Sequence, residues 1–120
     1  MGRMPQKPRS RGSGDPFRMP GAGVQSARME LSQFQTAIAR TYGARDADRG
    51  LEATVAWLAE EVGELARAVR KGTPEDQLHE LGDVLAWTIS LAEQLGLSAD
   101  EAVTRYATGC PACGSSPCEC

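Results

Sequence analysis

Aromatic residues and long apolar runs are both scarce in this sequence. Phe, Tyr and Trp together make up 5% of the 120 residues, so we expect a core of Leu, Val, Ala and Ile, which suits packed helices better than a sheet. No segment reaches the roughly 18 apolar residues of a membrane-spanning helix. The basic residues near the N-terminus precede no apolar segment of the kind that a secretory signal contains. These absences argue against a membrane or exported protein and predict a cytoplasmic one.

Charge is distributed unevenly along the chain. Residues 1–28 contain six Arg and Lys side chains against one Asp, a net charge of +5, which leaves −8 for the rest of a chain whose net charge is −3. Because nucleic-acid backbones are bound mainly by Lys and Arg, we predict no specific nucleic-acid partner for the acidic remainder. Carboxylates are the ligands that hard divalent cations prefer, so the composition favours metal binding.

Composition divides the chain into three parts. Residues 1–28 hold four of the seven prolines and cannot bury enough apolar surface to offset the entropy of ordering, so we predict a disordered basic tail. A nucleic-acid-contacting arm is the alternative, and Met19 or Met29 is an alternative start. Residues 29–108 are expected to form a helical domain, and residues 109–120 a Cys-rich tail.

Apolar residues recur at three- and four-residue spacing, which predicts amphipathic helices and no strand. We expect helices over residues 30–42, 51–71, 74–95 and 99–108. Gly43 should end the first helix, and the polar segment 44–50 should form a loop. Only a short turn at Gly72 and Thr73 separates the second and third helices, so these two should form an antiparallel pair. The predicted fold class is an all-α antiparallel bundle of about four helices.

The second and third helices each carry an apolar stripe suited to packing against another helix. Its residues are Leu51, Val55, Leu58, Val62, Leu65 and Val69 on the second helix, and Leu78, Leu81, Leu85, Ile89 and Ala92 on the third.

Carboxylates form a separate stripe on each of these two helices. Glu61 and Glu64 share a face of the second helix, and Glu80 and Asp83 share a face of the third. Glu64 and Glu80 lie at matching distances from the turn, so the four acids should meet. Facing carboxylates are costly to bury without a counter-charge, and a divalent metal would supply it. Two ordinary solvated faces are the alternative, but no Lys or Arg follows any of these acids at i+4.

These acids, set within the segments EEVGEL and ELGDVLAW, resemble the paired ExxE and ExxD motifs of the MazG-like nucleotide pyrophosphohydrolases. The likeness covers about residues 31–106. It implies an all-α bundle completed by oligomerisation, as a homodimer or homotetramer. It also implies an enzyme that cleaves a nucleoside triphosphate to the monophosphate and pyrophosphate, by attack of water at the α-phosphorus. In such a site Glu61, Glu64, Glu80 and Asp83 would hold Mg²⁺, for which Mn²⁺ could substitute.

The resemblance also directs attention to side chains around the acids. The candidate phosphate-binding cations are Arg45, Arg49, Lys71 and Arg105. Glu60 is a weaker candidate, as a structural acid or a general base. Trp57 and Trp87 are candidates for stacking on the nucleobase, with packing in the interior as the alternative. His79 is expected to be a solvated helix residue.

All four cysteines lie in the last eleven residues, as Cys110-x-x-Cys113 followed by Cys118-x-Cys120. The C-P-x-C-G turn is a familiar half of a zinc knuckle, because it brings two thiolates onto one tetrahedral ion. We therefore expect structural Zn²⁺ in this tail, with a redox-active or unliganded tail as the alternative. The tail also raises a second hypothesis for the chain, a helical adaptor whose zinc knuckle and basic arm bind a protein or nucleic acid.

Overall fold

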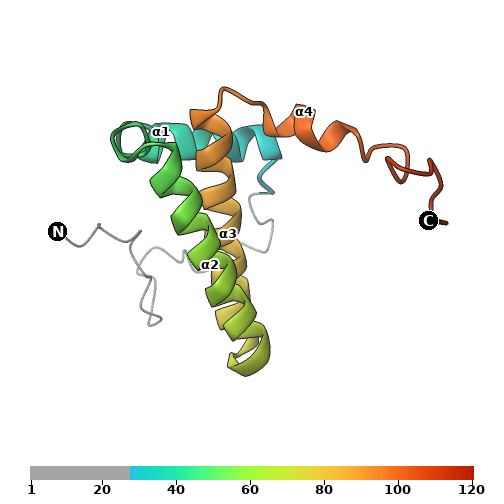
Figure 1. The fold of residues 1–120 in the computed structure, drawn as a ribbon, viewed down its shortest axis with the longest axis horizontal. Helices are drawn as coiled ribbons and strands as arrows, with labels where there is room; N and C mark the ends of the chain where they lie inside the picture. Colours follow the sequence, from blue (N-terminus) through green and yellow to red (C-terminus); the bar gives the residue numbers. More distant parts are fainter. Residues whose placement is uncertain (1–27) are drawn as a thin grey trace, which may run out of the picture.

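The computed structural model describes residues 28–120. This part folds into four helices without a strand: α1 (Leu31–Arg49), α2 (Leu51–Lys71), α3 (Pro74–Gln94) and the short α4 (Ala99–Thr104) (Figure 1). The predicted all-α class is confirmed. The basic tail expected at residues 1–28 falls, except for its last residue, outside the described residues. None of the helices in the described part is long and apolar enough to cross a membrane.

The first helix is longer than expected, because the segment 44–50 predicted as a loop continues α1 as far as Arg49. Gly43 lies inside the helix and does not end it. The reason is tertiary packing: Asp46 is 2% exposed and pairs with Arg49 one turn later. The Arg49 guanidinium lies 4.6 Å from the ring centroid of Trp87. Polar residues that look like a loop in the sequence are thus held in a helix by contacts with α3.

Short connections determine the order of the helices. Gly50 separates α1 from α2 with a φ of 83°, a left-handed conformation that favours glycine. Gly72 is needed for space, since a Cβ there would lie 2.8 Å from the Ala68 carbonyl oxygen. Thr73 caps α3 as predicted: its hydroxyl accepts a hydrogen bond from the Asp76 N–H, and the Asp76 carboxylate accepts one from the Thr73 N–H. The chain therefore reverses sharply, and α2 and α3 form the predicted hairpin.

The helix α1 crosses the open end of this hairpin (Figure 1), and the small core lies there. Its buried members are Ile38, Ile89 and Ala99, with Leu31, Phe34, Tyr42 and Ala86 packed against them. Gln35 of α1 ties this core to the connection after α3. Its Nε2 donates a 2.8 Å hydrogen bond to the Leu97 carbonyl, and its Oε1 accepts one from the Ala99 N–H.

The apolar stripes of the hairpin are largely exposed. Between 41% and 73% of the surface is accessible at Leu51, Val55, Val62, Val69, Leu78, Leu81 and Leu85. Instead of these stripes, α2 packs against α3 through a different and more polar face, which contains the buried residues Thr54 and Ala68. Gln94 of α3 donates a 2.7 Å hydrogen bond to Thr54 Oγ1, and Gln77 donates one to the Ala68 carbonyl. These exposed stripe residues therefore lack a covering helix within the described part of the chain.

The fourth helix is shorter than expected and ends at Thr104, because only Ala99 of this helix is buried and short helices need packing to persist. Ser98 caps it by accepting a hydrogen bond from the Glu101 N–H. After α4 the C-terminal tail extends away from the bundle (Figure 1).

Candidate metal and phosphate site

Three of the predicted acids meet between α2 and α3. Carboxylate oxygens of Glu61, Glu80 and Asp83 all lie within 4.8 Å of one another, and the three side chains are half-buried. Glu80 and Asp83 share one face of α3 because they are three residues apart, and Glu61 approaches them from α2. Carboxylates this close repel one another unless a cation lies between them, so the arrangement suits a divalent metal.

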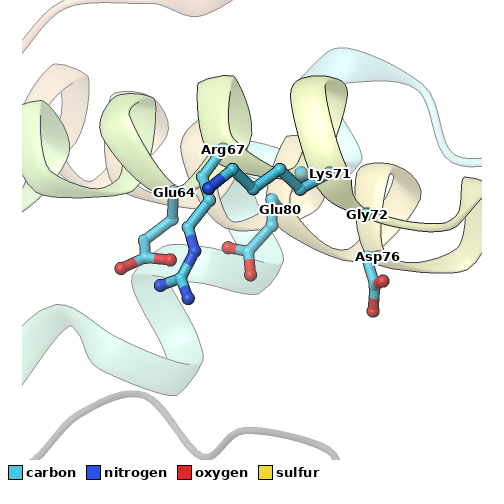
Figure 2. Close-up of a pocket in the computed structure, with 7 residues that line it drawn as sticks. Glu64, Arg67, Lys71, Gly72, Asp76 and Glu80 are labelled. Carbon is cyan, nitrogen blue, oxygen red and sulfur yellow. The ribbon is translucent and has the colours of Figure 1, made fainter.

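Glu64 lies about one turn further along α2 and is not part of this three-acid group. Together with Glu80 it lines a groove of about 360 Å³, whose other charged lining residues are Arg67, Lys71 and Asp76. Figure 2 shows the side chains of Glu64, Arg67 and Glu80 projecting to the same side of the hairpin. Glu80 thus belongs both to the acid group and to the groove, which connects the two.

His79 contacts the acid group, although the sequence predicted a solvated residue. Its Nε2 lies 3.3 Å from Asp83 Oδ2, across one turn of α3. The imidazole is therefore placed to orient the Asp83 carboxylate. The i,i+4 spacing of the two residues was the signal for this contact.

The two tryptophans stack on each other, with ring centroids 5.8 Å apart and an angle of 13° between the ring planes. Trp57 lies one turn before Glu61, and Trp87 lies one turn after Asp83. Trp87 is 2% exposed, and the Arg49 guanidinium lies over its ring. A nucleobase would have to displace one of these neighbours to stack on Trp87. The arrangement therefore favours interior packing for Trp87, whereas Trp57 is half-buried and keeps some accessible surface.

Two cations line the groove, and the sequence proposed only one of them for phosphate binding. Lys71 was predicted for this role and Arg67 was not, although Arg67 lies three residues after Glu64, a spacing that places both on one helix face. Both cations are exposed and able to reach a ligand in the groove. Arg49, by contrast, is 11% exposed and paired with Asp46, so its charge already has a partner within the fold.

The remaining predicted residues belong neither to the acid group nor to the lining of the groove. Glu60 is exposed on α2. Arg45 is exposed on α1 and does not lie in a loop. Arg105 follows α4, with its guanidinium 5.3 Å from the ring centroid of Tyr106.

A second cluster of potential metal ligands lies in the C-terminal tail. One Sγ atom from each of four residues lies within 4.8 Å of the others: Cys110, Cys113, Cys118 and Cys120. Hydrogen bonds from the backbone of Glu119 and Ser115 lower the pKa of the Cys113 thiol to about 6. Contacts with the other three sulfurs raise the pKa of Cys120 to about 11. The two directions have different causes: backbone hydrogen bonds stabilise the Cys113 thiolate, whereas contacts with the other sulfurs oppose ionisation of Cys120.

Comparison with known proteins agrees with the geometry of the hairpin. The family model described as the MazG nucleotide pyrophosphohydrolase domain matches residues 49–108, half of the chain. The matched segment contains the whole α2–α3 hairpin and the four predicted acids. It ends before the first cysteine, so the tail lies outside the family pattern. No curated protein matches the chain.

Proposed function

The chain belongs to the MazG nucleotide pyrophosphohydrolase family, and we propose that it hydrolyses nucleoside triphosphates to monophosphates and pyrophosphate in a Mg²⁺-dependent reaction. The observation that supports this most is the junction at Glu80. There the acid group completed by Glu61 and Asp83 adjoins a groove that carries Arg67 and Lys71. A solvated helix face provides scattered charges, whereas a triphosphate–metal complex needs clustered acids beside clustered cations.

The carboxylates present fit Mg²⁺. This ion prefers oxygen ligands, keeps several waters and binds through a few carboxylates together with substrate phosphates. Glu61, Glu80 and Asp83 would hold it, and Glu64 would contribute where the groove begins. Mn²⁺ prefers similar ligands and could substitute. When bound, the ion would polarise a water molecule and neutralise negative charge on the phosphates.

The side chains of the groove would bind and position the triphosphate. The Arg67 guanidinium offers a planar pair of donors for bidentate phosphate contacts, and Lys71 adds a mobile point charge. His79 would keep the Asp83 carboxylate oriented through their 3.3 Å contact. A general base must lie within hydrogen-bond reach of the attacking water. A Glu64 oxygen not engaged with the ion would be better placed for this role, because Glu64 lines the groove and Glu60 is exposed outside it.

We further propose that a second copy of the chain covers the exposed apolar stripes, giving a homodimer or homotetramer. Large apolar side chains gathered on one surface mark contact sites, because exposing them to water is unfavourable. Val62→Glu or Leu85→Glu should therefore reduce the mass measured by light scattering after size-exclusion chromatography. The control Ala56→Glu adds the same charge on an exposed position of α2 away from the stripe. A monomeric wild type would contradict the proposal.

Pyrophosphate release from a panel of canonical and modified nucleoside and deoxynucleoside triphosphates tests the proposed reaction. With Mg²⁺ present, Glu64→Gln and Asp83→Asn should each lower the rate by about 100-fold or more. Glu52→Gln, which neutralises an exposed acid on the same helix, should leave the rate nearly unchanged. If the folded wild type releases no pyrophosphate from any nucleotide, the adaptor hypothesis replaces the enzyme.

A further inference from the structure

We propose that the C-terminal tail is a structural zinc site in which one Zn²⁺ is held by the four cysteine thiolates. The site is formed by Cys110, Cys113, Cys118 and Cys120. It lies outside the segment that matches the family, and it shares no residue with the acid group or the groove. The inference therefore stands independently of the proposed reaction.

The separations between sulfur atoms fit one tetrahedral zinc ion. A Zn–S bond of about 2.3 Å places tetrahedral sulfur ligands about 3.8 Å apart. In the structure, 3.8 Å separates the Sγ atoms of Cys110 and Cys120, and 3.8 Å separates those of Cys113 and Cys118. All four sulfurs lie within 4.8 Å of one another. Neither pair is joined as a disulfide, in which the sulfur atoms would lie about 2.05 Å apart.

The backbone of the tail is shaped to bring these sulfurs together. The Gly114 N–H donates a 2.7 Å hydrogen bond to the Cys110 carbonyl, and the Cys110 N–H donates a 3.0 Å bond to the Ser115 carbonyl. Gly114 has a φ of 76°, and a Cβ at Gly109 would lie 2.8 Å from the Gly114 carbonyl oxygen. Both positions therefore favour glycine, and the resulting turn places the first pair of cysteines side by side.

Apart from these few hydrogen bonds, the tail has no apolar packing that could maintain this shape. None of residues 109–120 is buried, and this segment contains no Leu, Ile, Val, Met or aromatic residue. A short segment without an apolar core cannot offset its ordering entropy unless a metal or a covalent cross-link contributes. Four thiolates at these separations would also repel one another, and a dication would remove that repulsion. Four protein ligands leave no open position, which is typical of structural zinc and not of catalytic zinc.

Metal analysis of the full-length, tag-free protein tests the inference. Inductively coupled plasma mass spectrometry should find about one zinc ion per chain. Replacement of zinc by Co²⁺ should give the visible absorption bands of a tetrahedral thiolate site. Cys113→Ser and Cys118→Ser should each reduce the zinc retained against a chelator by about tenfold or more. The matched control Glu61→Gln should keep its zinc while losing nucleotide hydrolysis, which separates failure of this inference from failure of the proposed function.

Three results would overturn the zinc site. One is a metal-free native protein whose intact mass is lower by four hydrogens, because that mass indicates two disulfides. Another is stoichiometric iron in place of zinc. The third is zinc content that survives both cysteine substitutions, which would place the ion elsewhere. Circular dichroism of each variant checks that the helices remain folded.

Discussion

Two clusters of potential metal ligands lie in the part of the chain that the structure describes, and they depend on their surroundings in opposite ways. The acids Glu61, Glu80 and Asp83 project from two long helices, whose order comes from the Trp57–Trp87 stack and the buried face around Thr54. The cysteines lie in residues 109–120, where no residue is buried. The helices can therefore present their acids before any metal binds. The tail, in contrast, would need the proposed zinc ion in order to hold a fixed conformation. The first arrangement suits an ion exchanged with substrate, and the second suits a permanent ion.

The largest expected effect comes from removing the Trp87 side chain, which should destabilise the helical region without changing the tail. Trp87 is 2% exposed and contacts both Trp57 and Arg49. Trp87→Ala should therefore lower the free energy of unfolding by about 3–5 kcal/mol, measured by urea denaturation. Trp57→Ala should have a smaller effect, because Trp57 is only half-buried.

The zinc content of Trp87→Ala should equal that of wild type under conditions in which the variant is folded. If zinc were lost along with helix stability, the two regions would be coupled, and the contrast between them would be wrong.

Glu80→Gln should have the next largest effect, because Glu80 belongs both to the acid group and to the groove. We expect pyrophosphate release to fall by about 100-fold or more. Without Mg²⁺ the melting temperature should rise, since one of three mutually repelling carboxylates is removed. Adding Mg²⁺ should raise the melting temperature of wild type but not of the variant, because binding to the native state stabilises it.

Thermal denaturation with and without Mg²⁺ measures both effects of Glu80→Gln. The control Glu75→Gln neutralises an exposed acid near the start of α3. Should Glu80→Gln retain the wild-type response to Mg²⁺, the acid group would not be the magnesium site.

Arg67→Gln should have a more moderate effect that concerns the groove and not the ion. Losing one phosphate contact made equally in the ground and transition states should raise KM about tenfold and leave kcat nearly unchanged. Steady-state kinetics measures both constants. Arg70→Gln removes the same charge from an exposed position of α2 outside the groove. Equal effects of the two variants would indicate a general electrostatic contribution and no specific phosphate contact.

Local sequence patterns were sufficient to predict most of the hairpin. The bounds of α2 and the start of α3 follow from periodicity, from Gly72 and from the Thr73–Pro74 cap, which act within a few residues. The clustering of three acids also followed, because i,i+3 spacing on two antiparallel helices leaves little freedom. The contact between His79 and Asp83 is equally local but was not predicted, because a lone histidine on a helix is more often a solvated residue.

Contacts between distant segments could not be predicted in the same way. The extension of α1 depends on the burial of Asp46, on its ion pair with Arg49, and on the contact of Arg49 with Trp87, a residue on another helix. The periodicity of the α2 stripe identified an apolar face but not its partner, and the structure shows α2 meeting α3 through the face around Thr54 and Ala68. Periodicity reports which residues share a face and carries no information about what covers that face.

The smallest expected effect concerns the α2–α3 turn and its response to acid. The Asp76 carboxylate accepts a 2.8 Å hydrogen bond from the Thr73 N–H and a 2.9 Å bond from its hydroxyl. The bond from the Thr73 backbone is the main reason that the pKa of Asp76 lies below its ordinary value. A lowered pKa in the folded state means that the stabilising contribution is present above the unfolded-state pKa, about 3.9, and is lost as the pH falls through the folded-state value.

The difference in unfolding free energy between wild type and Asp76→Ala should therefore be constant near neutral pH and shrink below about pH 4. Urea denaturation over a pH series measures this difference. Glu75→Ala removes a charge from the same turn without removing the capping bonds, so its effect isolates the contribution of charge alone.

Thiolate–zinc bonds compete with protons at the sulfurs, so we expect the tail to release its ion at a higher pH than the pH at which the turn loses its cap. Simultaneous loss of both would show that one acid-induced transition unfolds the whole chain, against the independence inferred for the tail.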